Sequence, residues 1–237
     1  MKSKIAIINF SGNVGKSTLA KQLFAPRMQA QEFAVETINA GAGETTASER
    51  LKGKDFGHLQ EEMMRTDAAI VDIGASNVDE FVKLMGQFDG SHEEFDYFIV
   101  PVVSDKKQQT DTINTIKTLA GLGVPSKKIR VVFNKVAIDD ADDVASHFSM
   151  VWGFHAAEKK FTLRTDAVVF TNEIFDRLRI LNTSVDALVA DDTDYRTMLK
   201  DAKDDDAKDY AISMISAKRL AKSAHKNLDD VFKVLFK

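Results

Sequence analysis

Two glycines and a lysine near the amino terminus are spaced for binding phosphate. A loop that leads from a strand into a helix presents backbone N–H groups to an anion, and the start of the helix adds the positive end of its dipole. Lys16 reaches the terminal phosphates as a compact cation, and the Ser17 hydroxyl is a ligand for Mg²⁺. The predicted phosphate-binding residues are Gly12, Asn13, Val14, Gly15, Lys16, Ser17 and Thr18.

The second chemical signal is an aspartate at the end of an apolar run. Residues 68–73 read Ala-Ala-Ile-Val-Asp-Ile, and Gly74 follows them. An ionised carboxylate at the end of a buried strand is costly unless it is paired or lies near a metal. In a phosphate-loop protein this position lies beside Mg²⁺, so we expect Asp72 to hold the ion together with Ser17 and to act in catalysis together with Lys16. The alternative is an aspartate that caps the next helix.

Strand and helix patterns alternate over most of the chain. A continuous apolar run at 5–9 predicts a parallel strand that is buried on both faces, and further strands are predicted at 33–38, 68–73, 97–102, 129–135 and 167–170. A predicted helix begins at Lys16 and ends or kinks at Pro26, and further helices are predicted at 59–65, 77–87, 112–119, 139–148 and 172–180. This order predicts an α/β fold, a mostly parallel sheet with helices on both faces, with its ligand at the carboxyl ends of the strands.

After residue 190 the strand signals stop. We therefore divide the chain into a nucleotide-binding domain, 1–190, and a C-terminal helical extension, 191–237. The extension begins with an aspartate-rich segment, 191–209, which we interpret as a solvated helical face.

The end of the extension carries a basic stripe and an apolar stripe. The basic stripe comprises Lys218, Arg219, Lys222 and Lys226, and the apolar stripe follows it at 228–236. Three interpretations compete. The extension packs on the core or on a partner subunit, which we favour. It touches DNA phosphates with its basic stripe. Least favoured is an amphipathic tail on a membrane surface, because the two stripes occupy different segments.

Composition limits the class of protein. The chain has 237 residues, a formal net charge of −4 and no cysteine. A negative net charge gives no general attraction to nucleic acid, so any DNA contact needs a local patch. The lack of cysteine excludes disulfides and thiolate metal sites and fits a reducing compartment. The N-terminal apolar run is too short for a signal peptide, and no apolar stretch approaches the roughly 18 residues of a membrane span, so we expect a cytoplasmic protein.

Four segments together resemble the ParA/MinD branch of P-loop ATPases, and the plasmid stability StbB-like group in particular. The first two are Ile-Ile-Asn-Phe-Ser-Gly-Asn-Val-Gly-Lys-Ser-Thr, with Leu-Phe-Ala-Pro-Arg after it, and Ala-Ile-Val-Asp-Ile-Gly-Ala-Ser-Asn. The other two are the strand ends Val-Pro-Val and Val-Phe-Asn-Lys. The resemblance covers about residues 4–180. It implies ATP and Mg²⁺ as cofactors, a nucleotide-dependent homodimer, a DNA-binding partner protein, and a role in plasmid stability or segregation that is linked to conjugative transfer.

The chain departs from the family pattern at two loop positions and after the second strand. Ser11 stands where the family has a lysine that reaches the partner's phosphates, and Asn13 replaces its second glycine. For the acid that positions the attacking water, this chain offers Asn39 and then Glu44. The resemblance therefore implies a weak Mg²⁺-dependent ATPase. The alternatives are a nucleotide-gated binding module with little or no hydrolysis and a P-loop kinase for a small molecule.

The prediction that the chain binds ATP rather than GTP depends on the residues at the end of one predicted strand. Recognition of guanine by GTPases uses Asn-Lys-x-Asp, whereas here Asn134-Lys135-Val136 is followed by Ala137. ATP is therefore favoured over GTP. In ParA-like proteins an asparagine that resembles Asn134 contacts adenine, so the resemblance assigns Asn134 to cofactor binding; the alternative is a turn amide.

Overall fold

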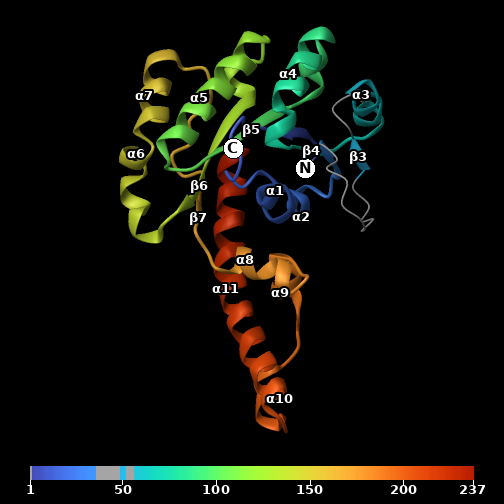
Figure 1. Ribbon diagram of the computed structural model, residues 1–237, viewed down its shortest axis with the longest axis vertical. Helices are drawn as coiled ribbons and strands as arrows, with labels where there is room; N and C mark the ends of the chain where they lie inside the picture. Colours follow the sequence, from blue (N-terminus) through green and yellow to red (C-terminus); the bar gives the residue numbers. More distant parts are fainter. Residues whose placement is uncertain (1, 36–48, 52–55) are drawn as a thin grey trace.

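A single parallel sheet organises the structure, a computed structural model that describes residues 2–35, 49–51 and 56–237 (Figure 1). Its seven strands run in the order β3-β2-β4-β1-β5-β6-β7, and every neighbouring pair is parallel. The predicted α/β fold is confirmed. The strands are β1 (Lys4–Ile7), β2 (Gln31–Val35), β3 (Glu49–Leu51), β4 (Ala69–Ile73), β5 (Tyr97–Val102), β6 (Ile129–Val136) and β7 (Val168–Phe170).

Two differences from the predicted strands concern the first half of the chain. The sequence analysis did not predict β3, which pairs with β2 at the edge of the sheet. The last three residues of the strand predicted at 33–38, together with Asn39 and Glu44, lie outside the described residues.

Helices cover both faces of the sheet. One face packs against α3 (Phe56–Arg65), α4 (Val78–Gln87), α5 (Lys106–Gly121), α6 (Val144–His147) and α7 (Ser149–Glu158). The other face packs against α1 (Lys16–Leu19), α2 (Ala25–Met28) and the end of α11 (Asp205–Leu235). The remaining helices are α8 (Ile174–Ile180), α9 (Val185–Ala190) and α10 (Tyr195–Asp201).

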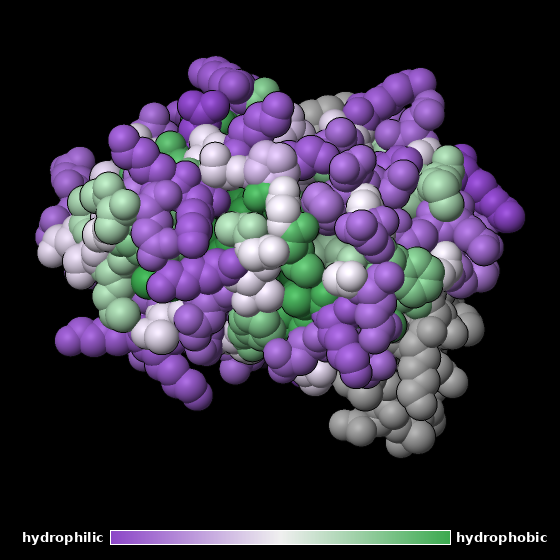
Figure 2. Space-filling view, turned by 90° about the horizontal axis from the view of Figure 1, so that it is seen from above, coloured by the Kyte–Doolittle hydropathy of each residue, from purple (hydrophilic) through white to green (hydrophobic). Residues whose placement is uncertain are grey.

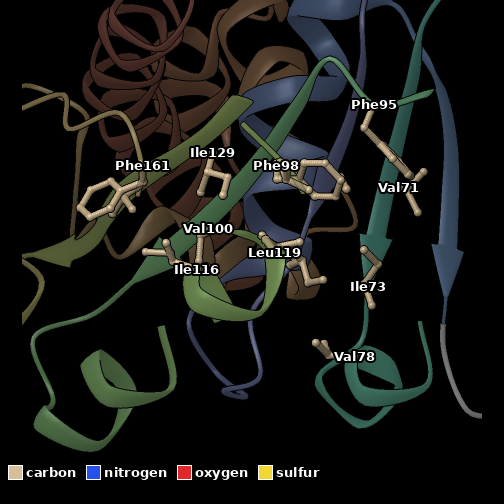
Figure 3. Close-up of a cluster of buried hydrophobic side chains, with 14 of the residues drawn as sticks. Val71, Ile73, Val78, Phe95, Phe98, Val100, Ile116, Leu119, Ile129 and Phe161 are labelled. Carbon is tan, nitrogen blue, oxygen red and sulfur yellow. The ribbon is translucent and has the colours of Figure 1, made fainter. Parts of the chain in front are cut away.

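Alternation along the strands separates the two hydrophobic cores. In β4, Val71 and Ile73 belong to the core under α4 and α5, whereas Ile70 belongs to the core under α1 and α11. Figure 3 shows the first core, in which Ile116 and Leu119 of α5 lie over the strand residues. Apolar residues on both faces explain why the strands read as continuous apolar runs.

The helix after the phosphate loop does not end at Pro26. After α1 it continues as a π-helix over Ala20–Phe24 and then as α2 to Met28. Pro26 cannot donate to the Gln22 carbonyl one turn earlier, and that carbonyl accepts from Arg27 Nη1 at 2.9 Å instead. Of the two predicted alternatives, an end at Pro26 is wrong, because the helix continues to Met28. The irregularity that is present is the wider π turn directly before the proline.

Two other helices differ from their predicted bounds. The helix α5 begins at Lys106 rather than at 112, because Asp105 caps it by accepting from the Gln108 N–H at 3.1 Å. The segment predicted as one helix, 139–148, is a 3₁₀ segment followed by the short α6. The sequence analysis did not predict α7, which buries Val151 and Phe154.

The C-terminal helix α11 connects two parts of the molecule. Leu228, Val231 and Leu235 pack under the sheet, whereas its earlier buried residues pack against α8, α9 and α10. In Figure 1 these three short helices and the first half of α11 form an arm below the body. The residue that begins the predicted extension, Asp191, lies between α9 and α10, so helices from both sides of that boundary share the arm's core.

The edge strand β7 is closed by a side chain of α11. Asn227 accepts from the Phe170 N–H at 3.0 Å and donates to the Val168 carbonyl at 2.9 Å. These two hydrogen bonds take the place of a neighbouring strand and cover an otherwise open edge.

Figure 2 shows a largely hydrophilic face, with small groups of hydrophobic side chains between the polar ones. Over the described ranges, none of the helices is both long enough and apolar enough to cross a bilayer.

Candidate nucleotide-binding site

The predicted phosphate loop lies between β1 and α1, at the carboxyl end of the sheet. Asn13 and Gly15 have positive φ angles of 59° and 88°, and Lys16 begins the helix directly after them. A methyl group on Gly15 would also lie 2.2 Å from Nδ2 of Asn134. Glycine is therefore required at position 15 both for its backbone angle and for the close approach of a side chain.

A buried asparagine that the sequence analysis read as the end of a strand holds the loop in place. Asn9 Nδ2 donates to the Pro101 carbonyl at 2.8 Å and to Thr112 Oγ1 at 2.7 Å. Its Oδ1 accepts from the Ser11 N–H at 2.8 Å. An amide among the apolar residues of a strand end was the available signal, because a buried carboxamide needs partners.

Lys16 lies buried across the loop. Its Nζ donates to the Ser11 carbonyl at 2.8 Å and to the Asn9 carbonyl at 3.2 Å. Burial lowers the pKa of Lys16, and the nearby negative charge of Asp72 opposes that shift. Its acceptors among the described residues are these two carbonyls, and a buried cation held in this way is suited to receive an anion in the loop.

Asp72 lies where the sequence analysis expected it, near the carboxyl end of a central strand. It pairs in register with Ile7 of β1 and with Ala34 of β2. Lys16 begins the helix that follows β1, the strand beside Asp72, and the negative charge of Asp72 favours the protonated form of Lys16. No group of three or more metal-binding side chains occurs among the described residues. The residues fit a Mg²⁺ ion that is held by the Ser17 hydroxyl and one carboxylate, with phosphate oxygens and water as its other ligands.

An open pocket of about 500 Å³ extends from the loop toward β7 and α8. Its volume is in the range of small-molecule sites. Seven of the nine predicted site residues line it, whereas Val14 and Asp72 do not. Beyond those seven residues, the pocket wall comprises Leu19, Gln22, Gly74, Ala75, Lys135, Val169, Phe170, Thr171, Asn172, Phe175, Asp176 and Leu228. Most of these belong to short or C-terminal elements that no motif marks.

Asn134 and Lys135 connect the end of β6 to the loop. Asn134 Nδ2 donates to the Val14 carbonyl at 2.8 Å, and Lys135 Nζ donates to the Asn13 carbonyl at 3.0 Å. The prediction gave Asn134 a role at the base, whereas these contacts also show it bracing the loop. That bond uses one of the two Nδ2 hydrogens, which leaves the second hydrogen as a donor and Oδ1 as an acceptor for a base.

The predicted basic stripe on α11 is incomplete. Arg219, Lys222 and Lys226 are exposed. Lys218 instead folds against the turn before α10, where its Nζ donates to the Asp191 carbonyl and lies 5.4 Å from the centre of the Tyr195 ring. We therefore correct the stripe to three exposed cations.

The sheet order and the loop between β1 and α1 define a P-loop α/β fold. Neither protein-family models nor curated protein sequences match this chain. Among solved structures, apo McdA of Cyanothece covers 94% of this chain, with 98% of its own length aligned, 12% sequence identity and a TM-score of 0.53. MinD of Aquifex aeolicus covers 93%, with 97% of its own length aligned, 12% identity and a TM-score of 0.52. The chain therefore has the fold of these two proteins, as its sequence resemblance to the ParA/MinD branch predicted.

Proposed function

We propose that this chain is an ATP-binding switch of the ParA/MinD type that acts in plasmid stability or segregation, with a link to conjugative transfer. The observation that carries the proposal is a phosphate loop between β1 and α1 whose Lys16 and Ser17 line a pocket large enough for a nucleotide, with Asp72 near the carboxyl end of the neighbouring strand β4. The fold supports the class, and the sequence resemblance supports the biological role.

The chain's own residues contribute positioning and charge. The loop N–H groups and Lys16 bind the β- and γ-phosphates, while Ser17 and Asp72 hold Mg²⁺, which neutralises phosphate charge when bound. To bind phosphate, Lys16 exchanges its two carbonyl acceptors for anionic oxygens, which form stronger hydrogen bonds. Phosphoryl transfer requires little covalent help, so this arrangement suffices for slow hydrolysis.

We further propose a cytoplasmic, nucleotide-dependent homodimer that acts with a DNA-binding partner protein. Direct, sequence-independent contact with DNA would use the three exposed cations of α11, Arg219, Lys222 and Lys226. They lie on the helix that also carries Leu228, a residue of the pocket wall. A nucleotide in that pocket therefore contacts the element that carries the basic surface.

A second candidate is a nucleotide-gated binding module that hydrolyses ATP slowly or not at all. The observation that favours it is Ser11, which supplies a hydroxyl where the resembled family has a lysine. The backbone of Ser11 is already occupied, since its N–H binds Asn9 and its carbonyl binds Lys16.

The test is to measure ATP binding, phosphate release and solution mass of the purified protein with Mg²⁺. We expect ATP to bind, Lys16→Ala to abolish that binding, and ATP but not ADP to shift the mass toward a dimer. Turnover that depends on Asp72 supports the ATPase, and binding without turnover supports the gated module. Transfer of phosphate to a small acceptor rather than to water would indicate a kinase. Failure of ATP to bind contradicts the proposal.

A further inference from the structure

A second hollow lies beside the phosphate loop, next to the amino terminus of α5. It has a volume of about 480 Å³ and shares Gly12 and Asn13 with the nucleotide pocket. Its lining is polar and comprises Ser11, Gly12, Asn13, Asp105, Lys107 and Gln108. The two hollows therefore meet at the same two loop residues, one on the side of α1 and the other on the side of α5.

Several hydrogen bonds fix the start of α5 against the loop. Gln108 Nε2 donates to the Gly12 carbonyl at 3.1 Å, and Asp105 caps the helix through the Gln108 N–H. Gln109, which is buried, donates to the carbonyls of Ser104 and His147 at 2.8 and 2.9 Å. The neighbouring Lys107 is thus carried by a well-anchored turn, while its own side chain is exposed.

The charges in this hollow favour an anion at its edge with the loop. Lys107 is the cation among its lining residues. The carboxylate of Asp105 accepts from the Gln108 N–H at the start of a 16-residue helix, whose dipole offsets part of its negative charge. On the side of the nucleotide pocket, the buried cation is Lys16.

The terminal phosphate of ATP gains charge on its oxygens during hydrolysis, and enzymes of this class stabilise that charge with a second cation in addition to the loop lysine. Ser11 carries no charge and cannot supply it. Lys107 lines the hollow on the α5 side of the loop, whereas Lys16 lines the pocket on the α1 side. Its flexible four-carbon stem gives Lys107 the reach of a mobile point charge.

We propose that Lys107 is a second phosphate-contacting cation, which binds the terminal phosphate of ATP bound to the same chain from the side of α5. The proposal rests on the proposed function in one respect, that ATP occupies the phosphate loop. It adds a residue outside the loop motif and makes a specific claim: Lys107 distinguishes a nucleoside triphosphate from a diphosphate.

The experiment compares three variants, Lys107→Ala, Lys107→Arg and Lys106→Ala. Lys106 is the matched control, because it is exposed in the same helical turn but does not line the hollow. The dissociation constants of a non-hydrolysable ATP analogue and of ADP are measured with Mg²⁺. We expect Lys107→Ala to weaken binding of the analogue by about tenfold, the value of a charge-assisted hydrogen bond, and binding of ADP by less than about twofold. The ratio of the dissociation constant of ADP to that of the analogue should stay close to the wild-type ratio in Lys107→Arg. It should be unchanged in Lys106→Ala.

The outcomes separate this inference from the proposed function. A Lys107→Ala variant that binds both nucleotides as the wild type does, or that weakens both equally, overturns the inference alone. A wild-type protein that binds neither nucleotide overturns the proposed function and the inference with it. The measurement is repeated at a low and a high protein concentration. Discrimination that appears only on dimerisation would assign Lys107 to the nucleotide of the second copy and overturn the same-chain contact.

Discussion

Asn134 of β6 donates a 2.8 Å hydrogen bond to the Val14 carbonyl, and the same nitrogen lies where a methyl group on residue 15 would be. The end of β6 and the phosphate loop therefore fit together only when residue 15 is glycine. Because Asn134 also lines the nucleotide pocket, the shape of the loop and the predicted base contact depend on one side chain.

This contact predicts a coupled effect of two substitutions. Gly15→Ala should reduce the free energy of unfolding by about 1–3 kcal/mol through backbone strain alone, and by more through the clash with Asn134. Adding Asn134→Ala removes the clashing amide, so the double variant should lose less stability than the sum of the single variants. Urea denaturation of the four proteins measures this coupling. Additive effects would show that the loop moves away from Asn134 without cost.

Lys16 should stabilise the nucleotide complex but not the nucleotide-free protein. Burial lowers the pKa of Lys16, so its protonated form costs more in the folded protein than in the unfolded chain. We expect nucleotide-free Lys16→Met to be at least as stable as the wild type, and ATP to stabilise only the wild type. The cost of the charge is fully present below the lowered pKa. The difference in the free energy of unfolding between Lys16→Met and the wild type should therefore become smaller as the pH rises from that pKa toward 10.5.

Denaturation with and without Mg²⁺-ATP at several pH values measures both effects. Lys21→Met is the control, because Lys21 is exposed on the same helical segment and lies outside the pocket lining. A large loss of stability in nucleotide-free Lys16→Met would mean that its two carbonyl contacts outweigh the desolvation cost.

Much of this site could be predicted from the sequence, because its chemistry lies in two contiguous motifs. The residues of the phosphate loop and Asp72 follow apolar strand signals, so their position at the carboxyl end of a parallel sheet follows from topology alone. The bracing by Asn9 could not be predicted, because its partners, Pro101 and Thr112, lie far along the chain. The same limit applies to Phe170 and Leu228, whose meeting in the pocket wall depends on tertiary packing.

The arm shows the same limit in another form. Regular spacing placed Lys218 with the other cations of α11, because helical periodicity reports which side chains share a face. It does not report which residue of that face is covered by a neighbouring turn, and the turn at Asp191 covers Lys218.

Asp72 should make nucleotide affinity depend on Mg²⁺. We expect Asp72→Asn to bind ATP with an affinity that changes little between Mg²⁺ and a chelator, whereas the wild type binds more tightly with Mg²⁺. Fluorescence titration with a labelled ATP analogue measures this difference. Asp67→Asn is the matched control, because Asp67 lies before the same strand and forms an exposed 2.7 Å ion pair with Lys2. Unchanged Mg²⁺ dependence in Asp72→Asn would assign the metal to other residues.

Asp191 should stabilise the arm in a pH-dependent way. Hydrogen bonds from Thr193, and then from Tyr195, lower the pKa of Asp191 from 3.8 to about 2, and Lys218 adds to the shift. A carboxyl group with a lowered folded pKa contributes stability that is fully present above its unfolded value. That contribution is lost as the pH falls from 3.8 toward about 2.

We therefore expect Asp191→Asn to be less stable than the wild type at neutral pH, and the difference to vanish near pH 2. Thermal unfolding followed by circular dichroism over this pH range tests the prediction. Substitution of the exposed neighbour, Asp192→Asn, is the control and should change stability little. A stability difference between wild type and Asp191→Asn that stays constant across the range would assign the effect to shape rather than to charge.

The corrected basic stripe predicts which cationic side chains of α11 contribute to DNA binding. Removing Arg219, Lys222 and Lys226 together should weaken binding to non-specific duplex DNA. It should also lower the slope of log affinity against log salt by about 0.9 for each lost phosphate contact. Lys218→Ala should instead leave that slope unchanged and reduce stability, because its Nζ holds the turn at Asp191. Fluorescence anisotropy at several salt concentrations, together with thermal unfolding, separates the two effects. A triple variant with the wild-type salt slope would show that this face of α11 does not contact DNA.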